Sequence, residues 1–264
     1  MLPKQDFFRN YSEKNNLPML DRNVLHEFLQ SEILHSLSTS KYAKTVSFLG
    51  GTALRFAYNI KRFSEDLDFD LVEKKGFKLE NLADDLGKNL EKKGYMVETK
   101  SKTTENIHII YLKFSGVLAE FGIKLAKNEK EVIKFEIDFD PPKYIEAETV
   151  LIDSFEKRFP LFVNKLDTLY AQKLLAFFFR PYQKGRDFYD LIWFISQKNL
   201  EPNYKILQEK NIPVSNKKEL IAAIQKRLTK LNLVEAANDV KRFLFDPREA
   251  DWIKDLPEYL DSAL

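Results

Sequence analysis

Cysteine is absent from this sequence of 264 residues, and histidine occurs only three times. Without cysteine, the chain can form neither disulfides nor thiolate metal sites. The histidines, His26, His35 and His108, lie far apart in the sequence, so we expect no zinc site and interpret them as ordinary helix or strand residues. The composition thus argues against disulfide-stabilised and zinc-dependent proteins.

Long apolar stretches are missing as well. No run approaches the length that a membrane span requires, and the N-terminus lacks the apolar region of a signal peptide. We therefore expect a cytoplasmic protein that does not enter a membrane. The net charge is only +2 and large basic runs are absent, so any binding of nucleic acid must rest on a local patch.

The remaining composition is that of an ordinary globular protein. Hydrophobic residues make up 44% of the chain and charged residues 31%. The length suffices for a sizeable core and for one or two domains. Phenylalanine is common, with 22 residues spread along the chain, and we interpret it as core filling.

The first informative motif is a pair of glycines. Residues 42–49 are typical of a short strand that ends at Gly50 and Gly51, and Thr52 is a suitable cap for a helix that runs to about residue 60. Glycine at such a junction lets the backbone approach a ligand closely. The free N–H groups and partial positive charge of a helix N-terminus suit a triphosphate.

Three alternating aspartates follow about fifteen residues later. Side chains alternate along a strand, so Asp66, Asp68 and Asp70 share one face, and the apolar residues between them share the other. Arg62 and Ser64 join the aspartate face if the strand begins that early. Neighbouring carboxylates repel and need a compensating cation, and Mg²⁺ suits them because it takes hard oxygen ligands from one or two carboxylates and from substrate phosphates.

Each motif alone has a simpler interpretation, because Gly-Gly can be a tight turn and the aspartates can line a solvated strand edge. Their order and spacing together favour a functional site.

The combination also resembles a known family. An apolar strand, Gly-Gly, a short helix and then Arg-x-Ser-x-Asp-x-Asp resembles the nucleotidyltransferases of the DNA polymerase β superfamily. More narrowly, residues 50–55 with 62–68 resemble the AbiEii toxin family, the toxin halves of bacterial abortive-infection and toxin–antitoxin pairs. The resemblance extends to Asp190, about two thirds of the chain.

This resemblance implies an α+β fold: a polymerase-β-like nucleotidyltransferase domain with a mixed sheet, followed by a helical C-terminal domain. It implies transfer of a nucleoside monophosphate from an NTP to an acceptor, with release of pyrophosphate. The expected acceptor is RNA, with the tRNA 3′ end as the leading candidate, and a cognate antitoxin is a possible partner. Two Mg²⁺ ions are expected, bridged by Asp66 and Asp68.

A third carboxylate is expected on a neighbouring strand, where it completes the metal site and helps to activate the attacking hydroxyl. Residues 132–140 alternate in the same way as the first aspartate strand, and either Glu136 or Asp138 fits this role. The family's pattern of lysine, apolar, acid, apolar favours Glu136. The simpler alternative is that one face of an antiparallel sheet is solvated.

Further candidates lie in the C-terminal half. Lys173 and Arg180 are seven residues apart and share one face of a predicted helix, where they can meet triphosphate oxygens. Alternatively, Lys173 extends along a core helix to solvent. Asp187 can cap the helix that it opens, and the resemblance assigns either Asp187 or Asp190 to the active site.

The predicted site therefore has two sets of residues. The catalytic set is Asp66, Asp68, Glu136, Asp138 and Lys173, with Asp66, Asp68 and Glu136 as metal ligands. The nucleotide-binding set is Gly50, Gly51, Thr52, Arg62, Ser64, Arg180, Asp187 and Asp190.

We predict two domains, over residues 1–150 and 151–264. In the first, helices are expected within 1–40, with Asp21 as an N-cap, and over 78–93, with Gly94 just past the end. Strands are expected over 95–100, 107–114 and 132–139. From about residue 153 onward we expect almost only helices, over 164–179, 187–197, 216–228, 233–245 and 248–259.

Two other functions remain open at this stage. One is a transferase of the same fold that acts on a protein or a small molecule. The other is a non-catalytic module that binds a nucleotide or a partner, which the intact Asp66 and Asp68 argue against.

Overall fold

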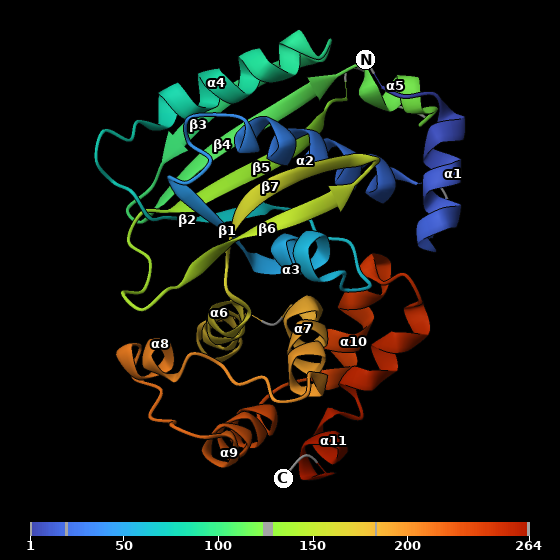
Figure 1. Cartoon of the computed structure of the whole chain (residues 1–264). Helices are drawn as coiled ribbons and strands as arrows, with labels where there is room; N and C mark the ends of the chain where they lie inside the picture. Colours follow the sequence, from blue (N-terminus) through green and yellow to red (C-terminus); the bar gives the residue numbers. More distant parts are fainter. Residues whose placement is uncertain (1, 19–20, 124–128, 183, 263–264) are drawn as a thin grey trace. The chain divides into compact units, whose positions relative to one another are not determined.

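The computed structural model in Figure 1 describes residues 2–18, 21–123, 129–182 and 184–262. The chain forms two compact units, and neither is continuous in sequence. Unit 1 consists of Met1–Asn59, Phe63–Pro141 and Glu148–Val163. Unit 2 consists of Ile60–Arg62, Pro142–Ala147 and Asn164–Leu264.

A mixed seven-stranded sheet forms the framework of unit 1 (Figure 1), with the strand order β3-β4-β5-β2-β1-β7-β6. Strand β2 pairs antiparallel with β1 and parallel with β5, and β1 also pairs parallel with β7. The strands are β1 (Val46–Leu49), β2 (Leu67–Leu71), β3 (Met96–Thr103), β4 (Ile107–Ser115), β5 (Glu131–Asp138), β6 (Ala147–Ser154) and β7 (Lys157–Asn164). The predicted α+β class with a mixed sheet is confirmed.

Helices pack on this sheet, and their bounds follow local signals in the sequence. The helices of unit 1 are α1 (Gln5–Asn15), α2 (Arg22–Ser38), α3 (Gly50–Tyr58), α4 (Leu79–Lys92) and α5 (Val117–Phe121). Asp21 caps α2 by accepting the N–H groups of Asn23 and Val24, as predicted. Gly94 follows α4 with a φ of +86°, the left-handed conformation expected of a C-terminal glycine.

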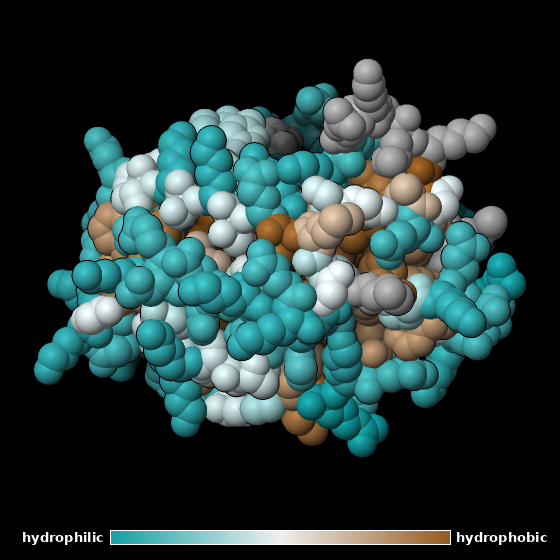
Figure 2. Space-filling model, turned by 90° about the horizontal axis from the view of Figure 1, so that it is seen from above, coloured by the Kyte–Doolittle hydropathy of each residue, from teal (hydrophilic) through white to brown (hydrophobic). Residues whose placement is uncertain are grey.

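Helix α4 is amphipathic and packs against β3. Its leucines at positions 79, 82, 86 and 90 are buried, whereas Glu80, Asp84 and Lys88 are exposed. The face seen from above in Figure 2, over α4, is correspondingly mostly hydrophilic. The buried side of α4 faces β3, β4 and α2.

Unit 2 is helical, as predicted for the C-terminal part. Its elements are α6 (Leu166–Phe179), α7 (Gly185–Ser196), α8 (Tyr204–Glu209), α9 (Lys217–Leu228), α10 (Leu233–Val240), the 3₁₀ helices η1 (Lys241–Phe243) and η2 (Pro247–Ile253), and α11 (Leu256–Ser262). Two predicted helices are therefore broken into shorter pieces. Within the described ranges, no helix has the length and apolar character to cross a membrane.

The expectation of helices from about residue 153 was wrong, because β6 and β7 form a hairpin there. Its two-residue turn, Phe155-Glu156, has φ angles of +48° and +60°. Such turns are usually recognised by Asn-Gly or Asp-Gly, and Pro160 lies inside β7, where proline argues against a strand. The hairpin was therefore not predictable from its turn residues or from the composition of β7.

The expected cap at Thr52 was also wrong. Helix α3 begins at Gly50, and the residue at its N-cap position is Leu49. Thr52 is buried within the first turn, and its hydroxyl donates a hydrogen bond to the backbone carbonyl of Asp66. Thr52 therefore connects α3 to the residue that precedes the aspartate strand.

Candidate active site

Two carboxylates lie side by side on adjacent strands of unit 1. Asp68 of β2 is in register with Glu136 of the parallel strand β5, so both side chains lie on the same face of the sheet. Asp138 is instead in register with Asp70, and its carboxylate accepts the N–H of Asp140 at 2.9 Å. Of the two candidates for the third carboxylate, Glu136 is the neighbour of Asp68.

Gly50 brings the start of α3 against this pair. Its φ of +76° is left-handed, and a Cβ at this position would lie 2.4 Å from Oδ2 of Asp68. A side chain at residue 50 would therefore displace the Asp68 carboxylate. Gly51 is buried in the same first turn. The close backbone approach at the glycine pair thus holds a carboxylate at a helix N-terminus, where the helix dipole favours negative charge.

Asp66 lies directly before β2 and is partly buried. Asp66 interacts electrostatically with Lys134. The Nζ of Lys134 lies 2.7 Å from Oε1 of Glu136. Burial lowers the pKa of Lys134, but the hydrogen bond and charge of Glu136 and the charge of Asp66 outweigh it and raise that pKa. Lys134 therefore stays protonated and offsets part of the acidic charge.

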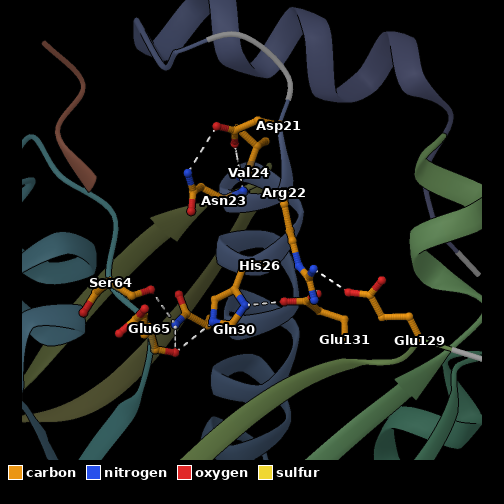
Figure 3. Close-up of polar contacts among 10 residues, drawn as sticks. All are labelled: Asp21, Arg22, Asn23, Val24, His26, Gln30, Ser64, Glu65, Glu129 and Glu131. Carbon is orange, nitrogen blue, oxygen red and sulfur yellow. Dashed lines mark hydrogen bonds and ion pairs between the residues drawn. The ribbon is translucent and has the colours of Figure 1, made fainter. Parts of the chain in front are cut away.

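The segment that leads into Asp66 is held by helix α2 (Figure 3). Nε2 of Gln30 donates to the carbonyl oxygens of Ser64, at 3.1 Å, and Glu65, at 2.9 Å. Nε2 of His26 lies 2.8 Å from the Glu65 carbonyl, and its Nδ1 lies 2.6 Å from Glu131. His26 is a residue of helix α2, as expected, and its ring also bridges the approach to β2 and the start of β5.

Sequence reasoning overlooked these supporting residues. The signal that could have revealed them is the polar composition of the buried side of α2. Glu27, Gln30, Ser31 and Glu32 are all buried among apolar residues, and buried polar groups require partners. Glu27, for example, accepts two hydrogen bonds of 2.9 Å from Arg55, a pairing that fixes α3 against α2.

The acidic residues fit Mg²⁺ by their chemistry. Among the residues that the structure describes, no group of three or more histidine, aspartate or glutamate side chains is already arranged around a metal position. Mg²⁺ does not need such a cage, because one or two carboxylates suffice when water and substrate phosphates complete the shell. The adjacent Asp68 and Glu136, with Asp66 beside Lys134, supply that donor set.

The predicted residues of unit 2 form a buried ionic cluster. Arg62 donates to both oxygens of Asp190 at 2.6 Å, and these side chains are 1% and 0% exposed. Lys173 lies 2.8 Å from Asp190 and 3.0 Å from Asp187. Arg180 contacts the other oxygen of Asp187. The cations predicted to bind the triphosphate are thus directed at buried carboxylates.

Two alternatives for this cluster were wrong. Lys173 does not extend to solvent, since its ammonium group faces Asp187 and Asp190. Asp187 does not cap α7, because that helix begins at Gly185 and has Lys184 at its N-cap position. The shared face of Lys173 and Arg180 is confirmed, because both contact Asp187.

Mutual attraction keeps the cluster ionised despite its burial. Burial raises the pKa of Asp190, but Arg62 and Lys173 together outweigh burial and hold that pKa below its ordinary value. Burial likewise lowers the pKa of Lys173, and the attraction of Asp190 and Asp187 reverses the effect and raises it. Each of these charges therefore needs its partners, because removing one would leave the others buried without an opposite charge.

The mixed sheet carries adjacent carboxylates beside a glycine-led helix, the arrangement that the resemblance to nucleotidyltransferases predicts. Solved structures share the fold at low sequence identity. MenT4, a nucleotidyltransferase toxin from Mycobacterium tuberculosis H37Rv, aligns over 98% of this chain and 99% of its own, with 15% identity and a TM-score of 0.55. JHP933 from Helicobacter pylori aligns over 92% and 96%, with 19% identity and a TM-score of 0.50.

Sequence comparison identifies the family. The profile described as the nucleotidyl transferase AbiEii toxin of a type IV toxin–antitoxin system matches residues 32–261, and the chain belongs to this family. Among curated protein sequences, none matches the chain.

Proposed function

We propose that this protein is a Mg²⁺-dependent nucleotidyltransferase that transfers a nucleoside monophosphate from an NTP to RNA, with the tRNA 3′ end as the leading acceptor. The observation that carries the proposal is the register of Asp68 with Glu136 beside the start of α3. Carboxylates brought together on neighbouring strands supply the hard oxygen ligands that Mg²⁺ prefers.

Several residues of unit 1 have separate proposed roles in the reaction. An acceptor hydroxyl forms a bond to the α-phosphorus, the bond from that phosphorus to the pyrophosphate oxygen breaks, and the hydroxyl proton passes to the carboxylate of Glu136. Asp66, Asp68 and Glu136 would hold Mg²⁺, which would offset the negative charge of the triphosphate. Lys134 limits repulsion among these carboxylates.

The triphosphate is proposed to meet the start of α3, where Gly50, Gly51 and the helix dipole face a negative ligand. Ser64 is a further candidate from the segment before Asp66. The nucleotide contacts of Arg62, Lys173, Arg180, Asp187 and Asp190 stay predictions, since these side chains pair with one another.

Support for an RNA acceptor comes from the sheet face that carries the carboxylates. Lys102 of β3 pairs with Ile109 of β4, which pairs in turn with Glu136 of β5, so Lys102 and Glu136 lie on the same face of the sheet. Lys100 and Tyr111 pair with each other two residues along these strands and lie on the same face. Lys100 and Lys102 are both exposed. Lysines attract phosphates, and an aromatic ring offers a stacking surface for a base. A protein partner is expected as well, because the family is described as part of a toxin–antitoxin system.

The acceptor and the toxic effect are tested together. The purified protein is incubated with each α-labelled NTP in turn, alone, with total RNA, with denatured cell protein and with small metabolites. We expect Mg²⁺-dependent label on RNA 3′ ends, loss of label in Asp66→Asn, and growth arrest on expression of the wild type that Asp66→Asn relieves. Label on protein or a small molecule would refute the RNA acceptor, and no turnover with any NTP would refute the enzyme.

A further inference from the structure

An aromatic groove on unit 2 is lined by none of the residues assigned to the predicted active site. It has a volume of about 340 Å³, within the range of about 300–1,000 Å³ that is usual for binding pockets. Its walls come from α7, η2 and the segment around α11. The lining residues are Tyr189, Ile192, Trp193, Ser196, Trp252, Asp255 and Tyr259.

Two of the four rings of this groove are exposed to solvent, whereas Tyr189 is buried and Trp193 is partly buried. Trp252 is 48% exposed and Tyr259 is 38% exposed. The ring of Tyr189 lies parallel to that of Trp252, with centroids 6.1 Å apart and planes 4° from parallel. The Tyr189 hydroxyl donates to Glu249 at 2.5 Å, so its polar end is bound within the protein. Clustered exposed aromatic side chains of this kind mark contact surfaces.

The charge around the groove selects the kind of ligand. The chain as a whole carries +2, yet residues 246–261 contain six carboxylates and two cations, a net charge of −4. Both cations are paired internally, Arg248 with Asp246 and Lys254 with Asp251, each at 2.6 Å. Asp255 lines the groove itself. This field repels phosphates and attracts cations.

We propose that this groove binds a basic segment of a partner protein, with an arginine side chain inserted among the aromatic rings. A guanidinium stacks on tryptophan and tyrosine faces and also pairs with a carboxylate. Here Trp252 and Tyr259 offer the faces and Asp255 offers the carboxylate, while Ile192 gives an apolar contact for a neighbouring aliphatic side chain. The proposal is independent of the proposed transferase activity.

The chain supplies its own reporter for this site. It has two tryptophans, and both line the groove. Tryptophan emission is followed while a short capped peptide of alternating leucine and arginine is added. A saturable change is expected, weakened by salt because an ion pair is screened. The peptide with glutamine in place of arginine should bind at least about tenfold more weakly, the equivalent of about 1.4 kcal/mol.

Variants separate this site from non-specific attraction. Asp255→Asn should weaken binding of the arginine peptide about tenfold. Tyr144→Ala, which removes a tyrosine that is 48% exposed elsewhere in unit 2, should leave it unchanged. Because Trp252→Ala can disturb folding, Tyr259→Ala with a check of the melting temperature serves as a second aromatic variant and should also weaken binding.

Several outcomes would overturn the proposal. Equal binding of the arginine and glutamine peptides would show an apolar ligand instead of a cationic one. A saturable response to an RNA oligonucleotide that displaces the peptide would show a nucleic-acid site. Concentration-dependent dimers that Tyr259→Ala abolishes would assign the groove to a second copy of the chain. Binding that Asp255→Asn and Tyr259→Ala leave intact would place the peptide elsewhere.

Discussion

Glycine is required at residue 50 for two independent reasons, its left-handed backbone and its close approach to Asp68. Substitutions can test the two reasons separately. Gly50 has a φ of +76° and sits against Asp68, whereas Gly76 has a similar φ of +73° and open space within 4 Å of where a Cβ would lie. The left-handed conformation costs alanine about 1–2 kcal/mol at either site. Only at residue 50 does the added methyl group also displace a proposed metal ligand.

We therefore expect Gly50→Ala and Gly76→Ala to lower the free energy of unfolding by similar amounts. Only Gly50→Ala should lower the rate of nucleotide transfer, by about a hundredfold, because it displaces a catalytic group. Urea unfolding and initial rates of label transfer measure the two effects. Equal transfer by both variants would show that the position of Asp68 against the glycine is irrelevant to catalysis.

The buried charge of Asp190 predicts a pH dependence of stability. Its pKa in the folded protein lies below the ordinary value of 3.8, so ionised Asp190 stabilises the fold above about pH 4, and this contribution is lost as the pH falls through the folded-state pKa. Asp190→Asn should cost about 3–5 kcal/mol, because it leaves Arg62 and Lys173 buried without their carboxylate.

Denaturant unfolding between about pH 2 and pH 7 measures this effect. The variant should lose part of the acid-dependent slope of the wild type, and Asp84→Asn on the exposed side of α4 should change stability by less than about 0.5 kcal/mol. An Asp190→Asn protein as stable as the wild type would show that the buried cluster does not support unit 2.

At the scale of elements, helix α2 acts as a support for the aspartate strand. The Gln30 amide donates to the carbonyls of Ser64 and Glu65, the two residues directly before Asp66. A small displacement of a catalytic group can cost about a hundredfold in rate. Gln30→Ala is therefore expected to lower kcat by about 10- to 100-fold with little change in KM for the NTP.

Asn23→Ala is the matched control on the same helix, because the Asn23 side chain bonds to Asp21 instead of the Ser64–Glu65 segment. It should leave kcat unchanged. A Gln30→Ala enzyme with wild-type kcat, or one whose activity falls only in proportion to its folded fraction, would contradict a positioning role for α2.

Elements with strong local signals were predictable from the sequence, and those that depend on distant contacts were not. The leucine stripe and following glycine predicted α4, and alternation of apolar and polar residues predicted β4 and β5. The β6–β7 hairpin was missed because its turn lacks asparagine and glycine and Pro160 lies within a strand. The division of residues 233–259 into α10, two 3₁₀ helices and α11 was missed for a similar reason, since apolar spacing persists across the breaks.

At the scale of the whole molecule, the same distinction applies to the site. Alternation alone put Asp68 and Glu136 on polar strand faces, but only the pairing of β2 with β5 shows that Glu136, and not Asp138, is the neighbour of Asp68. The inward orientation of Lys173 and Arg62 was not predictable, because it depends on Asp187 and Asp190 more than ten residues away in the sequence. Family resemblance named these residues without revealing their pairing.

The organisation of the chain explains why Arg62 belongs to the helical unit. The residues Ile60–Arg62, which lie in sequence between α3 and β2, are part of unit 2. Arg62 forms a β-bridge with Leu244, and the Lys61 carbonyl accepts the N–H of Phe245 at 3.1 Å. The motif Arg-x-Ser-x-Asp-x-Asp therefore begins in one unit and ends in the other.

The central claim is that Asp68 and Glu136 form the catalytic acidic pair. Its most direct test is the initial rate of Mg²⁺-dependent label transfer from an NTP to RNA for three variants of matched size: Asp68→Asn, Glu136→Gln and Asp138→Asn. We predict that the first two lose at least about a hundredfold in rate. The melting temperature should hold or rise in Asp68→Asn, which removes one of two neighbouring carboxylates, and fall slightly in Glu136→Gln, which also removes the ion pair with Lys134. Asp138→Asn should retain activity within a few fold. Full activity in Asp68→Asn or Glu136→Gln, or loss in Asp138→Asn alone, would contradict this assignment.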